Sequence, residues 1–263
     1  MDSLVLLEER EKVAIIRLNR PDKRNAMDRA SRVALLGAFQ TIRDRFPVVI
    51  LTGSSESFCS GVDLKEHKQD IDRGVPPDPA SDWIEVIVAI REHSAVFVAA
   101  VNGLALGGGS TLISVCDLAI AAEEAEIGMP EIGFGAYPQF SGPGAQMQLT
   151  AKRAAWLVLT GERINGRTAE AWGMVNACVP RAGLMEEAER LATRISRFDP
   201  LALSEAKRAL DTVPAKISDW RQAFEYGLGV NTRVRERGRV QSEALSGFTA
   251  GQRGPGQGTR SRP

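Results

Sequence analysis

Short apolar runs alternate with longer amphipathic segments along much of this chain. The runs Val13–Leu18, Val48–Leu51, Phe97–Val101 and Leu118–Ala122 consist almost entirely of apolar residues. Short continuous runs of this kind are typical of strands that are buried on both faces of a sheet. Val5–Glu8 precedes the first run across the charged segment EREK, and this pair predicts a β-hairpin.

Helical patterns fill the intervals between these strands. Asp28 is a suitable N-cap for a helix that runs to about Arg45. The predicted apolar side of this helix consists of Val33, Leu36, Ala38 and Phe39. Trp83–His93 also has helical spacing, whereas the glycine and prolines within Asp70–Asp82 predict a loop. Strands that alternate with helices predict an α/β fold with one central core.

The C-terminal part of the chain has a different pattern, in which strand signals are scarce. Helices are predicted at Leu184–Arg197, Leu201–Asp211 and Ile217–Arg239. Pro200 and Pro214 are predicted to separate them, because proline cannot continue the hydrogen bonding of a helix interior.

We expect three regions along the chain. Residues 1–198 form the core that contains the candidate site, and residues 199–250 form the helical region. The final segment, residues 251–263, has almost no apolar side chains to bury and is predicted to be irregular.

The composition is that of an ordinary globular protein. Of the 263 residues, 43% are apolar and 25% are charged, and the formal net charge is +0. This balance gives no indication of a nucleic-acid partner. No apolar run approaches the roughly 20 residues that a membrane helix requires, and the N-terminus lacks the basic start of a signal peptide. We therefore expect a cytoplasmic protein with neither a nucleic-acid nor a membrane partner.

Cysteine and histidine are too sparse to indicate a metal site. Cys59, Cys116 and Cys178 are widely spaced, and His67 and His93 are the only histidines in the sequence. We expect no disulfide framework and no metal centre, and we predict that the cysteines are small core residues.

The most unusual pattern lies within Val101–Pro138. Gly107, Gly108 and Gly109 are consecutive, and Glu131 follows a proline further along the chain. Glycines leave backbone N–H groups accessible to a ligand, and a positioned carboxylate can move a proton. These two features together suit the stabilisation of an oxyanion during proton transfer. The structural alternative is a close crossing of a helix and a strand that admits only glycine.

Several short motifs occur in a fixed order along the chain. They are Asn19-Arg20-Pro21 with Asn25-Ala26-Met27, Phe58-Cys59-Ser60-Gly61-Val62-Asp63-Leu64, Val101–Gly109, Cys116-Asp117, Pro130-Glu131 and Leu159-Thr160-Gly161. In this order and spacing they resemble the motifs of the crotonase superfamily, also called the enoyl-CoA hydratase/isomerase family. The resemblance extends from about Val5 to Phe248.

This resemblance implies a fold and a substrate class. The fold is a crotonase-like spiral of strand-strand-helix turns, followed by a helical region through which subunits form homotrimers, often paired into hexamers. No repeat in the sequence shows the spiral by itself. The implied substrate is an acyl-CoA thioester, so CoA enters as part of the substrate and no separate cofactor is expected.

The resemblance also implies roles for individual residues. The backbone amides of Val62 and Gly108 are expected to bind the enolate oxygen, and Glu131 to act as acid and base. Hydratases of the family use two glutamates, and the first of these two positions is Thr111 here. One carboxylate suffices to move a proton between two carbons, so isomerase-like proton transfer is favoured. The alternatives are hydration by Glu131 alone, decarboxylation or hydrolysis of a thioester, and acyl-CoA binding without turnover.

A CoA-binding set is implied near the N-terminus. The carbonyl of Ser60 is expected to accept a hydrogen bond from the adenine amino group, and Arg24 to approach the phosphates. Lys65 could assist Arg24, and Ala26 and Gly61 complete the set.

Overall fold

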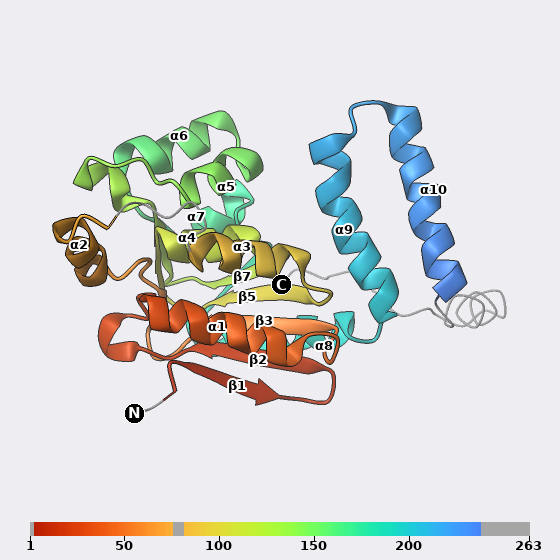
Figure 1. Ribbon diagram of the computed structural model, residues 1–263, viewed down its shortest axis with the longest axis horizontal. Helices are drawn as coiled ribbons and strands as arrows, with labels where there is room; N and C mark the ends of the chain where they lie inside the picture. The colour runs from red at the N-terminus through yellow and green to blue at the C-terminus, as the bar shows by residue number, and fades with distance from the viewer. Residues whose placement is uncertain (1–2, 76–81, 238–263) are drawn as a thin grey trace.

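Two β-sheets form the centre of the fold. The computed structural model describes residues 3–75 and 82–237 (Figure 1). Within these residues, the larger sheet has the order β1-β2-β3-β5-β7-β10, and the smaller sheet has the order β4-β6-β8-β9. The strands of the larger sheet are β1 (Val5–Glu9), β2 (Val13–Leu18), β3 (Val48–Gly53), β5 (Val96–Val101), β7 (Leu118–Ala122) and β10 (Ala177–Val179). Those of the smaller sheet are β4 (Ser57–Cys59), β6 (Leu104–Leu106), β8 (Glu126–Gly128) and β9 (Ile164–Asn165).

The predicted strands of the larger sheet are confirmed. β1 and β2 form an antiparallel hairpin, and β2, β3, β5, β7 and β10 run parallel to one another. Every residue of β3 and β5 is buried. Parallel strands covered on both faces have no side that faces water, which explains why their sequences are continuous apolar runs.

The helix α1 (Arg29–Ile42) begins at the predicted cap. The Asp28 carboxylate accepts a hydrogen bond from the Ser31 N–H at 2.8 Å. The helix ends before the predicted Arg45, and its buried apolar residues are Leu35, Phe39 and Ile42. The prediction that Val33 lies on the apolar side is wrong, since Val33 is 57% exposed. The spacing of the buried residues places Val33 on the far side of the helix.

Pairs of strands followed by helices give the fold its repeat. β3 and β4 precede α2 (Leu64–Asp72) and α3 (Asp82–Glu92), and β5 and β6 precede α4 (Gly108–Val115). β7 and β8 precede the short helix η2 (Pro130–Phe134), α5 (Ser141–Gln148) and α6 (Ala151–Thr160). The first strand of each pair joins the larger sheet, and the second joins the smaller sheet. This arrangement is the expected spiral of strand-strand-helix turns.

Two boundaries differ from the predictions. The predicted loop Asp70–Asp82 is shorter, because α2 extends to Asp72 and α3 begins at Asp82. Residues 76–81 lie outside the described part of the chain. Pro214 does not separate two helices but lies inside α9 (Pro200–Lys216), which ends shortly after it. A proline this close to a helix end removes few backbone hydrogen bonds.

The C-terminal helices extend away from the sheets. α7 (Gly166–Trp172) and α8 (Leu184–Ile195) pack on the core, whereas α9 and α10 (Trp220–Arg237) form an antiparallel pair that projects from it (Figure 1). No described helix combines the length and the apolar character of a membrane span. The predicted irregular segment, residues 251–263, lies outside the described residues.

A buried cation attaches α9 to the core. The side chain of Lys207 is 4% exposed, and its Nζ donates hydrogen bonds to the carbonyl oxygens of Ile90 and Ala95 at 2.7 and 2.8 Å. The same Nζ lies 2.9 Å from the Asp117 carboxylate, which also accepts from the Phe97 N–H at 2.8 Å. Burial lowers the pKa of Lys207, and the neighbouring Asp117 carboxylate opposes that shift. Lys207 therefore ties the helical region to the strands β5 and β7.

Replacing Lys207 tests this attachment. The substitution Lys207→Met should lower the free energy of unfolding by about 3 kcal/mol, because it leaves buried oxygens without their donor. Urea unfolding followed by circular dichroism measures the change. The matched control is Lys216→Met on the same helix, where the side chain is exposed and the loss should stay below about 1 kcal/mol. Equal losses in the two variants would contradict the proposed attachment.

Candidate active site

The candidate site lies where three parallel strands of the smaller sheet end. β4 is followed by Gly61, β6 by Gly107, and β8 by the segment that carries Glu131. Neighbouring parallel strands have their carboxyl ends at one edge of a sheet, so the segments that follow them lie close together. The spiral thus brings together residues that are far apart in the sequence.

Gly61 allows two of these segments to touch. Its φ of +94° is in the region that favours glycine. A Cβ built on Gly61 would lie 2.7 Å from the carbonyl oxygen of Leu106 and 3.2 Å from the amide nitrogen of Gly108. A side chain here would therefore collide with backbone. The Gly61 α-carbon lies beside the amide of Gly108 because glycine leaves that space open.

The amide of Val62 points away from the N-terminal segment. Met27 forms a parallel bridge with Val62, in which the Met27 N–H donates to the Gly61 carbonyl at 2.8 Å. The Met27 carbonyl in turn accepts from the Asp63 N–H at 3.2 Å. In such a bridge the middle residue directs its own N–H away from the bridging partner. The Val62 N–H therefore takes no part in the bridge with Met27. The segment that carries it lies beside Gly108.

The three consecutive glycines each face a different neighbour. A Cβ on Gly107, whose φ is +51°, would lie 2.7 Å from Glu131 Oε1. On Gly108 it would overlap Cζ2 of Trp83, and on Gly109 it would overlap the Cys59 carbonyl oxygen. The structural alternative, a close crossing that only glycine permits, thus holds for Gly109. Gly107 and Gly108 open the first turn of α4 to the carboxylate and to the indole.

The Glu131 carboxylate forms no ion pair with any residue that the structure describes. Ser141 Oγ donates to Glu131 Oε1 at 3.4 Å. Glu131 Oε2 is buried and has no hydrogen-bond partner among the described residues. Burial raises the pKa of Glu131, and the Ser141 hydroxyl partly offsets that rise. A raised pKa together with a free oxygen suits a group that takes up and releases a proton.

The apolar residues on the two sides of Glu131 in the sequence differ in burial. Met129 is fully buried, whereas Phe134 is 69% exposed. The indole of Trp83 is also buried, and its ring centroid lies 6.2 Å from that of Phe140. Neither Trp83 nor Ser141 was foreseen as a site residue. Trp83 gave no separate signal, because a tryptophan in a helical pattern is usually a core residue.

Thr111 lies in the first turn of α4 and is buried. Its hydroxyl donates to the carbonyl oxygen of Gly107 at 3.3 Å. A hydroxyl has one proton to donate, and this bond uses it. Thr111 can therefore offer only a lone pair to a water molecule, and it provides no second acid or base.

The predicted CoA-binding residues occupy two adjacent segments. The Ser60 N–H donates to the Arg24 carbonyl at 3.0 Å, and the segment that contains Ala26 continues into the bridge beside Gly61. Arg24 follows the short helix η1 (Pro21–Lys23) and has a left-handed backbone, with φ at 51°. Lys65 lies in the first turn of α2 and is exposed, as is Arg24. The segments meet, but their contact with CoA remains a prediction.

Asn25 holds these segments in place. Its side-chain amide donates to the carbonyl oxygens of Ser54 and Ser57 at 3.0 and 2.7 Å, and its Oδ1 accepts from the Arg20 N–H at 2.9 Å. The φ of Asn25 is 56°, a conformation that asparagine tolerates better than most residues. This buried amide fixes the turn that presents Arg24.

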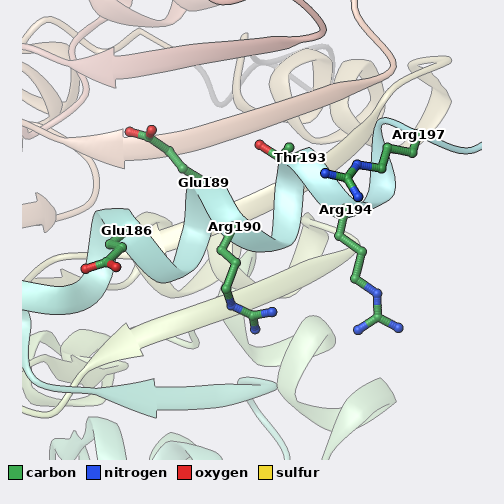
Figure 2. Close-up of a pocket in the computed structure, with 6 residues that line it drawn as sticks. All are labelled: Glu186, Glu189, Arg190, Thr193, Arg194 and Arg197. Atoms are coloured by element: carbon green, nitrogen blue, oxygen red, sulfur yellow. The ribbon is translucent and has the colours of Figure 1, made fainter. Parts of the chain in front are cut away.

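A separate hollow lies along α8. Its volume is about 510 Å³, and it is lined by Glu186, Glu189, Arg190, Thr193, Arg194 and Arg197. Figure 2 shows that these side chains come from α8 and the residues just after it. Arg190 is paired with Glu187 at 2.7 Å. Charges of both signs on the outer face of one helix are typical of a solvated surface, and we assign no role to this hollow. Among the described residues, no group of three or more His, Cys, Asp or Glu could hold a metal ion.

The comparisons with known proteins agree on one family. Residues 8–247 match the sequence model of a family described as enoyl-CoA hydratase/isomerase. The chain belongs to this family. Its members act on CoA thioesters, so this hydratase/isomerase-family protein is an acyl-CoA enzyme.

Individual relatives and a solved structure support the assignment. The protein is 35% identical to mevalonyl-coenzyme A hydratase of Aspergillus fumigatus, over 72% of this chain and 70% of the relative. It is 31% identical to hydroxycinnamoyl-CoA hydratase-lyase of Pseudomonas fluorescens, over 84% and 82% of the two chains. The crystal structure of an enoyl-CoA hydratase of Mycobacterium smegmatis superposes with a TM-score of 0.87 and 26% identity, covering 96% of this chain and 98% of that one. The crotonase fold, including the C-terminal helices, is confirmed, and the relatives are of the hydratase type.

The hydrogen bond from Ser141 to Glu131 predicts a shift in pH dependence. Glu131 must be ionised to accept a proton, so turnover should fall as the pH drops through its raised pKa. The Ser141 hydroxyl lowers this pKa. The substitution Ser141→Ala should therefore move the acidic limb of kcat/KM to higher pH. Ser114→Ala is the control, because Ser114 Oγ donates to the Ser110 carbonyl. An acidic limb that stays in place in Ser141→Ala would contradict the assignment.

Proposed function

We propose that this protein moves a proton between carbons of an enoyl-CoA thioester and thereby shifts a double bond. One observation carries the proposal. Glu131, with a buried oxygen that has no partner among the described residues, faces the glycine turn that contains Gly108, while the first hydratase glutamate position holds Thr111. One titratable carboxylate beside backbone donors is sufficient for a transfer in which the proton leaves one carbon and returns to another.

The backbone amides stabilise the intermediate in this proposal. Loss of a proton next to the thioester carbonyl produces an enolate, whose charge lies on the oxygen. The N–H groups of Val62 and Gly108 donate to that oxygen, and one such donor contributes about 3 kcal/mol of barrier lowering. Gly108 is the first residue of α4, so the partial positive charge of the helix N-terminus adds to the stabilisation.

Glu131 carries the proton through the reaction. As a carboxylate it accepts the proton from one carbon, and as a carboxylic acid it returns the proton to the carbon at the other end of the allylic system. The pKa raised by burial favours this exchange near neutral pH. The CoA moiety is bound by Ser60 and Ala26 through the backbone and by Arg24 and Lys65 through charge.

Hydration is the second candidate function. The names of the two relatives describe hydratase and hydratase-lyase activities. In that case Glu131 alone activates a water molecule, and Thr111 accepts a hydrogen bond from the water through its lone pair. Decarboxylation or hydrolysis of a thioester is a third candidate, and acyl-CoA binding without turnover is a fourth.

A product analysis in deuterated water distinguishes these candidates. The protein is incubated with crotonyl-CoA or 3-hexenoyl-CoA, and the CoA products are identified by mass spectrometry. The proposal predicts a shifted double bond with incorporated deuterium and no added water. Glu131→Gln should reduce turnover about a thousandfold and leave CoA binding intact. Glu126→Gln is the control, because Glu126 pairs with Arg163 and is exposed. A 3-hydroxyacyl-CoA product would establish hydration instead.

The variant Thr111→Val further distinguishes double-bond migration from hydration. Valine has nearly the shape of threonine but cannot bind a water molecule. Double-bond migration should survive this substitution, since it needs no bound water. Loss of a hydration product in Thr111→Val would identify the hydroxyl as part of a hydratase site.

We also propose that the helical region assembles the protein into a homotrimer or a pair of trimers. Large apolar side chains on α9 and α10 are exposed in the single chain, namely Leu210, Trp220, Phe224 and Leu228. Exposed apolar surface of this extent supports a protein–protein contact. Phe224→Ser should shift the sedimentation equilibrium towards the monomer, whereas Val33→Ser on α1 should not. Monomeric wild-type protein would contradict the assembly.

A further inference from the structure

Trp83 has a buried hydrogen-bond donor that no described residue of the fold accepts. The residue is 3% exposed, and its Nε1 has no hydrogen-bond partner in the part of the chain that the structure describes. Buried donors are nearly always paired, because leaving one unpaired costs about 1–3 kcal/mol. Other roles of the ring, such as packing on Phe140, do not require a nitrogen at this position.

The unused donor lies at the candidate active site. Trp83 stands in the first turn of α3, which packs against α4 (Figure 1). The ring atom Cζ2 would overlap a Cβ on Gly108, and Cε2 lies 3.1 Å from the position of that Cβ. Nε1 is bonded to Cε2, so the donor is one bond away from a ring atom that lies against Gly108. The donor is therefore close to the residue whose amide is assigned to the enolate oxygen.

The chemistry around the indole limits what the donor can bind. Phe140 is apolar, and the hydroxyl proton of Thr111 is already donated to the Gly107 carbonyl. The charged group of this site is the Glu131 carboxylate, beside the adjacent Gly107. An anionic acceptor would be repelled by this carboxylate in a poorly solvated space. An uncharged oxygen would accept the N–H without that cost.

We propose that Trp83 determines acyl specificity by donating its Nε1–H to an uncharged oxygen, a hydroxyl or a carbonyl, carried by the acyl chain. This inference rests on the proposed function, which assigns the thioester oxygen to Val62 and Gly108, so the acceptor is a further oxygen of the substrate. A plain alkyl chain leaves the donor buried and unpaired. A site built around such a donor disfavours analogues that lack the acceptor.

Binding of unreactive acyl-CoA pairs tests the inference without turnover. The ligands are 4-hydroxybutanoyl-, 5-hydroxypentanoyl- and 6-hydroxyhexanoyl-CoA, each compared with the alkyl isostere in which a methyl group replaces the hydroxyl. Full-length protein with ¹⁵N-labelled tryptophan is titrated with each ligand, and the Trp83 indole resonance is assigned by its loss in Trp83→Phe. At least one hydroxylated ligand should shift this resonance downfield and bind about fivefold to tenfold more tightly than its isostere.

Two variants keep the test specific. Trp83→Phe retains an aromatic ring but has no N–H, so the preference for the hydroxylated ligand should disappear. Trp156→Phe is the matched control, because Trp156 is 47% exposed on α6, and it should keep the preference. Circular dichroism establishes whether Trp83→Phe is folded, and if it is not, the wild-type titrations decide.

The possible results separate this inference from the proposed function. Equal affinities within all three pairs and an unmoved indole resonance would overturn the inference while leaving acyl-CoA binding intact. If adipyl-CoA, which ends in a carboxylate, bound more tightly than 6-hydroxyhexanoyl-CoA, the inference of an uncharged acceptor would be contradicted. Failure of every acyl-CoA to bind would overturn both the inference and the proposed function.

Discussion

The site depends on one constraint, the close approach of the glycine turn at residues 107–109 to three other parts of the chain. Gly107, Gly108 and Gly109 have no side chains, and in that space lie the Glu131 carboxylate, the Trp83 ring and the Cys59 carbonyl. Any Cβ in this turn would collide with one of them. The parallel ends of β4, β6 and β8 bring Cys59, the glycine turn and Glu131 to one edge of the smaller sheet, and the packing of α3 on α4 adds Trp83.

The elements that could be predicted are those long enough for their pattern of apolar residues to be recognised. β3 and β5 are apolar at nearly every position because both their faces are buried, and the sequence marks them clearly. β4, β6 and β8 have only three residues each, so no alternation can develop in them. The spiral was therefore invisible in the sequence, since its repeat depends on these short strands.

The candidate site was predictable where residue type carries the chemistry. Glu131 and the glycine turn stand out as a carboxylate and as bare backbone, and the family motifs place both. Val62 cannot be recognised by its residue type, because any residue other than proline would provide the same backbone amide. Only the resemblance to the family identified it. Trp83 and Ser141 depend on tertiary contacts that bring α3 to Gly108 and α5 to Glu131, and local sequence does not indicate such contacts.

The spiral distributes the proposed chemical parts among successive turns. The first strand pair ends at the Gly61–Val62 segment, the second at Gly108 and Thr111, and the third at Glu131. Each of these groups follows its own strand pair. A side chain in one turn of the spiral can therefore change while the backbone of the other turns is kept. A glutamate in place of Thr111 would add a second proton carrier, while the proposed donors at Val62 and Gly108 would remain backbone atoms. Such independence of parts lets one scaffold serve many reactions over evolutionary time.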